Sequence, residues 1–220
     1  LSLIASRSND SWTHRNGSAG HTIAHPALGR SLTQAFSVTI GEGDSRRARI
    51  TSAPVVANSA VFTLDARSQV TATATSGATL WSVNIAPRSD NLSDASGGGI
   101  ATDGNTIFVT TGFGELTALD ASTGAKVWTQ DLDAPGTSAP TVRDGLVYVV
   151  ARNSAAWALD ASNGRIKWQL NGTPSVGNFA GGAGAAVSGD ISVFPFPSGE
   201  VVATFPEGGT RRWQTVLSGE

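Results

Sequence analysis

The sequence ALDASTGAKVW occupies residues 118–128, and a close copy of it, ALDASNGRIKW, occupies residues 158–168. The two copies keep their polar residues as faithfully as their apolar ones. In the first copy, Asp120 and Ser122 can accept backbone N–H bonds within a turn, and Gly124 can adopt the positive φ that closes it. The phrase therefore predicts a recurring turn followed by a strand that carries tryptophan, and the second copy repeats the turn residues at Asp160, Ser162 and Gly164.

The phrase belongs to a longer unit that occurs four times along the chain. Within each unit, short polar turns separate runs of β-branched or aromatic residues, as in VRDGLVYVV at 142–150. This pattern is typical of antiparallel hairpins, and no segment shows a convincing helical period. We expect four strands per unit, with the last strand placing a tryptophan over the junction to the next unit. These tryptophans are Trp81, Trp128, Trp168 and Trp213.

A sheet of this kind cannot bury both of its faces alone, so successive sheets should stack around an axis as the blades of a β-propeller. The sequence predicts an all-β fold with four blades of four antiparallel strands, at residues 46–90, 91–134, 135–175 and 176–220. Residues 1–45 form a lead-in, in which QAFSVTI at 34–40 resembles an outer strand of a ring-closing blade. We interpret the chain as a partial ring of an eight-bladed propeller, whose open blade edges could self-associate.

Composition excludes several classes of function. The 220 residues carry a net charge of −2. The largest groups of basic residues are Arg46, Arg47 and Arg49 and the pair at 211–212, so the sequence does not support a nucleic-acid-binding surface. The absence of cysteine excludes disulfides, thiolate metal sites and cysteine nucleophiles. No apolar run approaches the ~20 residues that a membrane-spanning helix requires.

Few residues suggest catalysis or metal binding, and we assign no catalytic, cofactor or metal residue. His14, His21 and His25 lie close together, but Pro26 disfavours the helix that metal-binding spacing would need. We interpret these histidines as hydrogen-bonding to the backbone, and metal binding stays open. The acidic residues at blade turns are expected to be solvated; they are Asp65, Glu115 and Glu200.

Aromatic residues near loops are candidates for contact with a partner. Phe113 falls at a turn tip, and Phe194 and Phe196 fall in or beside a proline-rich run. Each could anchor a partner or pack against another blade. Trp157 occupies the place of Thr117 in the preceding unit and is expected to be interior.

The phrase A-x-D-x-x-T-G-x-x-x-W resembles the tryptophan motif of the quinoprotein (PQQ-like) β-propeller repeat. Two units match it well, at Asp120, Gly124 and Trp128 and again at residues 160, 164 and 168. The fuller likeness is to the BamB family of outer-membrane assembly lipoproteins. It lies in Trp12 with HTIAHPALG at 21–29, in IGEGDSRRARITSAPVV at 40–56 and in TTGFGELTALD at 110–120.

The resemblance implies a non-enzymatic periplasmic scaffold of the outer-membrane β-barrel assembly machinery, peripheral to the inner leaflet of that membrane and without a cofactor. It implies a lipid anchor on an N-terminal cysteine, which this chain lacks, and a partner in the periplasmic domains of BamA. The family's binding loop matches residues 170–184 here, where Val176, Asn178 and Phe179 are the candidate contacts. Family members carry an arginine in this loop, and this chain does not.

Two other functions are compatible with a propeller. One is a fragment of a PQQ-dependent quinoprotein dehydrogenase. The resemblance to those enzymes implies a cofactor site with a vicinal cysteine disulfide, which this chain cannot form because it has no cysteine. The other is a solute- or glycan-sensing propeller of an extracytoplasmic receptor.

Overall fold

The computed structural model describes the chain except residues 1–2, 47, 88–96, 137, 176–181 and 218–220. The described residues form strands and turns without a helix, and their strands make four sheets of four antiparallel strands, each in simple meander order. The predicted all-β fold of four-stranded blades is therefore confirmed. The first two sheets comprise β1 Val55–Ala57, β2 Ala60–Leu64, β3 Gln69–Ala74 and β4 Thr79–Asn84, then β5 Gly98–Thr102, β6 Thr106–Thr111, β7 Glu115–Asp120 and β8 Lys126–Asp131.

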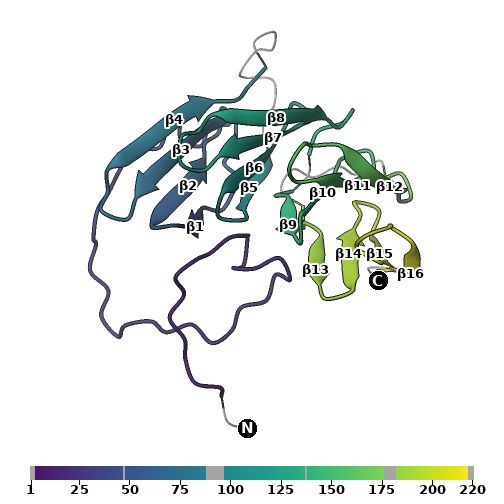
Figure 1. Cartoon of the computed structure of the whole chain (residues 1–220), viewed down its shortest axis with the longest axis horizontal. Coiled ribbons are helices and arrows are strands. Elements are labelled where there is room, and N and C mark those ends of the chain that lie inside the picture. The colour runs from purple at the N-terminus through teal and green to yellow at the C-terminus, as the bar shows by residue number, and fades with distance from the viewer. Residues whose placement is uncertain (1–2, 47, 88–96, 137, 176–181, 218–220) are drawn as a thin grey trace.

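The third sheet comprises β9 Thr141–Arg143, β10 Leu146–Val150, β11 Ala155–Asp160 and β12 Ile166–Asn171, and the fourth comprises β13 Ala186–Ser188, β14 Ile191–Pro195, β15 Glu200–Thr204 and β16 Arg211–Val216. The four sheets follow one another along an open arc (Figure 1). Each junction between neighbouring sheets encloses its own apolar cluster, so the molecule has three consecutive cores instead of one. The sheets fall within the four predicted ranges, whose exact boundaries stay predictions.

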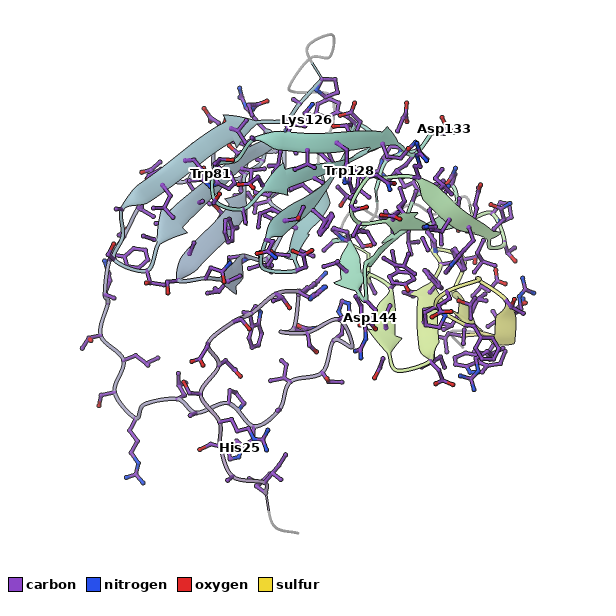
Figure 2. All side chains as sticks on the ribbon, in the orientation of Figure 1. His25, Trp81, Lys126, Trp128, Asp133 and Asp144 are labelled. Atoms are coloured by element: carbon purple, nitrogen blue, oxygen red, sulfur yellow. The ribbon has the colours of Figure 1, made fainter. Side chains whose placement is uncertain are left out.

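The first three tryptophans of the repeat each link their own blade to the next one. The indole Nε1 of Trp81 donates to the carbonyl of Ala121 at 3.0 Å, and that of Trp128 donates to Ala161 at 3.0 Å. Trp168 makes the equivalent bond to Pro206 at 2.8 Å. Trp81 and Trp128 project from the outer strands of neighbouring blades (Figure 2). Trp213 has no such neighbour among the described residues, and its exposed fraction is 45%.

The recurring glycine lies directly under the indole of the preceding blade. Gly124 has φ +72°, and a β-carbon added to it would lie 2.6 Å from Cε3 of Trp81. Gly164 meets Trp128 in the same way, at 2.6 Å. Glycine is therefore required twice over at this position, once by the backbone conformation and once by the close approach of the ring.

The acidic residue of the turn organises the turn backbone. One carboxylate oxygen of Asp120 accepts from the backbone N–H groups of Ser122 at 3.0 Å and Thr123 at 2.9 Å, and from both hydroxyls. The expectation that Ser122 accepts a backbone bond is wrong, because its hydroxyl donates to Asp120 and Thr123 accepts the N–H of Ala125. Hydrogen bonds from Ser162 and then Lys167 lower the pKa of the equivalent Asp160 to about 2.

The interpretation of the stretch at 34–40 as an outer strand requires it to pair with a neighbouring strand. The stretch forms no strand, and no described segment pairs with it. One of its contacts nevertheless follows the repeat. Phe36 packs on Gly77, whose added β-carbon would lie 3.0 Å from the Phe36 β-carbon, much as Trp81 packs on Gly124. FSVTI at 36–40 also aligns with WSVNI at 81–85. Phe36 thus covers the first blade's turn, and membership of a ring-closing blade stays a prediction.

Residues 12–21, which we call the inner strap, cross the innermost strand of every blade. Trp12 exchanges two backbone bonds of 2.8 Å with Val56, and the carbonyl of Thr13 accepts from Thr102 at 3.0 Å. At the third blade the N–H of Val142 donates to His14, and at the fourth the N–H of Val187 donates to Ala19. Figure 1 shows this purple segment along the concave side of the arc. The strap pairs inner-edge groups that would otherwise lack protein partners.

We predict that Gly124→Ala lowers the free energy of unfolding by about 3 kcal/mol, because it combines left-handed backbone strain with a clash against Trp81. Urea denaturation measures the loss. Gly145→Ala is the matched control, since Gly145 has φ +77° but no atom within 4 Å of its added β-carbon. That variant should lose only about 1 kcal/mol. Equal losses in the two variants would contradict the role assigned to the indole contact.

Candidate functional site

The loop between the third and fourth blades leaves β12 and returns to β13. Val176, Asn178 and Phe179, the candidate contacts predicted from the sequence, lie outside the described residues. The described ends of the loop are fixed: the N–H of Gly172 donates to Ser154 at 2.8 Å, and that of Thr173 donates to Glu200 at 2.6 Å. The structure therefore holds both ends of the candidate segment against residues of the blades, because Ala185 at the far end accepts from the hydroxyl of Thr141.

Two of the acidic residues expected to be solvated are buried, so that expectation is wrong for them. Glu200 is 3% exposed and Asp65 is 6% exposed. Asp65 accepts backbone N–H groups of Arg67 and Gln69, both at 2.7 Å, and of Glu42 at 2.8 Å. A buried carboxylate is stable when several donors converge on it. These residues fix loops to blades and are not free for a partner, whereas Glu115 is half-buried.

The aromatic candidates separate into interior and surface residues. Phe194 is fully buried and Phe196 is 5% exposed, so neither offers a surface for a partner. Phe196 packs on Gly172, where an added β-carbon would lie 2.6 Å from the Phe196 ring. Trp157 is interior at 4% exposed, as predicted, and Phe113 is half-buried at its turn.

A cavity of about 340 Å³, which no sequence pattern predicted, opens beside the start of the loop. It is lined by Arg152 together with Asp133, Ala134, Pro135, Asn153, Pro174 and Ser175. Within the described part of the chain, the buried Nε of Arg152 has no hydrogen-bond partner. A guanidinium N–H without an acceptor is costly to bury, so this group is suited to an acceptor brought by another molecule.

The three histidines contact the backbone and do not converge. His14 is 3% exposed, and its Nε2 accepts the N–H of Val142 at 2.9 Å. Burial, and then the proximity of His21, lower the pKa of His14 to about 4. Nε2 of His21 lies 3.1 Å from the carbonyl of Ala185, and burial lowers the pKa of this side chain too. Nδ1 of His25 lies 2.7 Å from the carbonyl of Ile4.

Among the described residues, no three His, Cys, Asp or Glu side chains gather closely enough to hold a metal ion. The same part of the chain contains no helix of the length and apolarity needed to cross a membrane.

Comparison with known proteins gives a consistent result. The family model described as "Outer membrane protein assembly factor BamB" matches residues 66–220. A protein of that name from Yersinia pestis is 29% identical over 171 residues, which is 75% of this chain and 43% of the relative. The chain thus spans less than half the length of that relative.

Two solved structures show the same fold. A crystal structure of BamB from Moraxella catarrhalis matches with a TM-score of 0.51 and 18% identity, over 76% of this chain and 65% of that one. A europium-containing methanol dehydrogenase matches with a TM-score of 0.73 and 17% identity, over 95% of this chain and 49% of that one. At these identities the likeness concerns the propeller fold alone.

The burial of neutral His14 predicts a pH dependence of stability. Its pKa falls from 6.5 in the unfolded chain to about 4 in the folded one, so between these values the unfolded chain binds the extra proton. The contribution of neutral His14 to the free energy of unfolding should be fully present above pH 6.5. It should decrease as the pH falls towards 4, by about 3 kcal/mol for this residue. Urea unfolding at several pH values measures this slope.

His14→Gln should reduce the slope in that window, with the remainder coming from His21, whose pKa burial also lowers, and His25→Gln, which alters an exposed histidine, should leave it unchanged. An unchanged slope in His14→Gln would show that other groups cause the dependence. The carboxylate of Asp160, whose pKa falls from 3.8 to about 2 on folding, stabilises the fold fully above pH 3.8. Its contribution is lost only as the pH falls from there towards 2, below the window of His14.

Proposed function

This chain belongs to the BamB family of outer-membrane protein assembly factors, and from that premise we propose that its protein is a non-enzymatic scaffold of the β-barrel assembly machinery. The family match across residues 66–220 is the observation that carries the proposal. A scaffold needs a rigid body that holds loops in fixed positions, and propeller blades joined by tryptophan contacts form such a body.

The proposed partner is the set of periplasmic domains of BamA, and the proposed contact is the loop between the third and fourth blades. In this arrangement Val176 and Phe179 supply apolar anchors and Asn178 supplies a polar contact. Arg152 supports the assignment, because it lines the cavity beside Pro174 and Ser175 and its Nε has no hydrogen-bond partner among the described residues. Arg152, in the turn between β10 and β11 of the same blade, would then supply the arginine that the loop sequence lacks.

The proposed location is the periplasm, at the inner leaflet of the outer membrane, through a lipid anchor outside this chain. Self-association through open blade edges is a further expectation, for which the exposed Trp213 offers a surface. The dehydrogenase alternative gains no support from the methanol dehydrogenase match, since a likeness at 17% identity concerns the fold alone.

We predict that Val176→Asp combined with Phe179→Asp weakens binding to BamA periplasmic domains at least tenfold, because charged groups replace apolar anchors at an interface centre. Arg152→Gln should weaken binding about tenfold, since it removes the charged donor beside the loop. Isothermal titration calorimetry with purified BamA domains measures both effects.

Ile166→Asp is the matched control. Ile166 is 46% exposed on β12, away from the loop, so this change adds one negative charge to the same blade, where the loop variant adds two. Binding should be retained. If the loop variants bind normally while Ile166→Asp does not, the outer strands and not the loop form the contact.

A further inference from the structure

A second cavity, of about 380 Å³, lies between the third and fourth blades; we call it the junction cavity. It is formed by the turns β9–β10, β13–β14 and β15–β16. In a meander these turns lie at the opposite end of the strands from the loop that follows β12. The cavity is therefore separate from the proposed BamA contact. Its main lining residues are Leu146, Tyr148 and Phe205, with the carboxylates of Asp144, Asp190 and Glu207.

Tyr148 is the single tyrosine of the chain, and it occupies a position that is phenylalanine in the first two blades. Phe62 pairs with Ala72 and Phe108 pairs with Ala118, just as Tyr148 pairs with Ala158. In each blade the ring packs beside the repeat tryptophan, with centroids 5.9, 6.0 and 6.1 Å apart. The packing needs only the ring, so the hydroxyl of Tyr148 is not explained by the fold.

The Tyr148 hydroxyl has no partner within the described part of the chain. The residue is 1% exposed and lines the junction cavity, yet no described hydrogen bond uses its oxygen. The oxygen is not one of the fully buried, unpaired side-chain atoms of the described residues, so it opens onto the cavity, where an external group can pair with it. Burial, and then the carboxylate of Asp144, raise the pKa of Tyr148 to about 12, so the phenol remains neutral.

The three carboxylates of the junction cavity are also not a feature of the repeat, because the same positions are uncharged at the first junction. The equivalent cavity between the first two blades carries Asn58, Asn105 and Ser122 at the positions of Asp144, Asp190 and Glu207, and its one carboxylate, Asp120, stands at the position of Phe205. Arg143 pairs with Asp144 at 3.1 Å and Arg212 pairs with Asp190 at 2.9 Å. Three carboxylates thus face two guanidinium groups, which leaves one negative charge in excess.

The aromatic wall already accepts a cation. The guanidinium carbon of Arg212 lies 4.7 Å from the centroid of the Phe205 ring, and Phe205 is 45% exposed. Cations are attracted to aromatic faces, and the aliphatic stem of a long basic side chain packs on apolar surface. The junction cavity therefore combines an apolar wall, an acidic rim and an unused phenol oxygen.

We propose that the junction cavity binds an arginine or lysine side chain of a partner protein. The aliphatic stem lies on Leu146 and Phe205, and the cationic head donates to the phenol oxygen of Tyr148 and to the acidic rim. This inference goes beyond the proposed function and does not depend on it, because the cavity and the BamA loop lie at opposite ends of the blades.

The single tyrosine permits a direct test by NMR. With ring-¹³C-tyrosine labelling, the chain gives signals from Tyr148 alone. Titration with N-acetyl-arginine amide or N-acetyl-lysine amide should shift these signals saturably, and the neutral N-acetyl-glutamine amide should not. The proposal would be overturned by the absence of a saturable shift or by an equal shift with the glutamine derivative. A shift with the sugar maltose alone, which a glycan-sensing propeller would give, would also overturn it.

Variants taken from the chain's own repeats complete the test. Asp144→Asn, Asp190→Asn and Glu207→Ser together replace the three carboxylates with the residues found at these positions in the first junction, and should weaken binding of the arginine derivative at least tenfold. Tyr148→Phe reproduces the first two blades, so it should fold normally and weaken binding roughly threefold to tenfold by calorimetry.

Asp10→Asn, which removes an exposed charge in the lead-in, is the control and should bind normally. Undiminished binding by the triple variant would overturn the proposal. Val176→Asp with Phe179→Asp should leave the tyrosine shift intact, so a failure of the loop proposal and a failure of this one are distinguishable.

Discussion

The contact between an indole ring and the glycine turn of the next blade is the interaction on which the rest of the structure depends. Each sheet has two faces, and neither is buried until a neighbour covers it. The Nε1 bond from Trp81 to Ala121 fixes where that neighbour sits, because a hydrogen bond is directional and burial of apolar area is not. The carboxylate of Asp120 in turn holds the loop that presents this carbonyl.

The outer tryptophans and the inner strap act on opposite sides of the same blades. The tryptophans link neighbours pairwise, so stability passes from blade to blade as in other repeat proteins. The strap instead contacts all four blades within ten residues of chain, through backbone groups and the ring of His14. Two of these contacts join residues more than a hundred positions apart, between His14 and Val142 and between Ala19 and Val187. The strap therefore opposes any relative movement of the inner strands.

The sheets were predictable from the sequence because the same pattern of strands and turns occurs four times. The pattern of one short strand can be misassigned, but four matching copies support the same assignment. Features that break the pattern were not predictable in this way. Phe36 replaces a tryptophan in a stretch that forms no strand, so only its contact with Gly77 reveals its role. Asp65 and Glu200 were expected to be solvated, because a sequence records that a residue is acidic but not that backbone N–H groups converge on it.

Departures from the repeat are the natural place to look for function in a protein of this kind. A residue that recurs in every blade is explained by what every blade needs, namely a turn, a junction and a core. Tyr148 differs from Phe62 and Phe108 by one oxygen that no described bond uses, and the ring packing beside the repeat tryptophan is the same without it. The hydroxyl therefore requires an explanation outside the blade, and a ligand that pairs with it provides one.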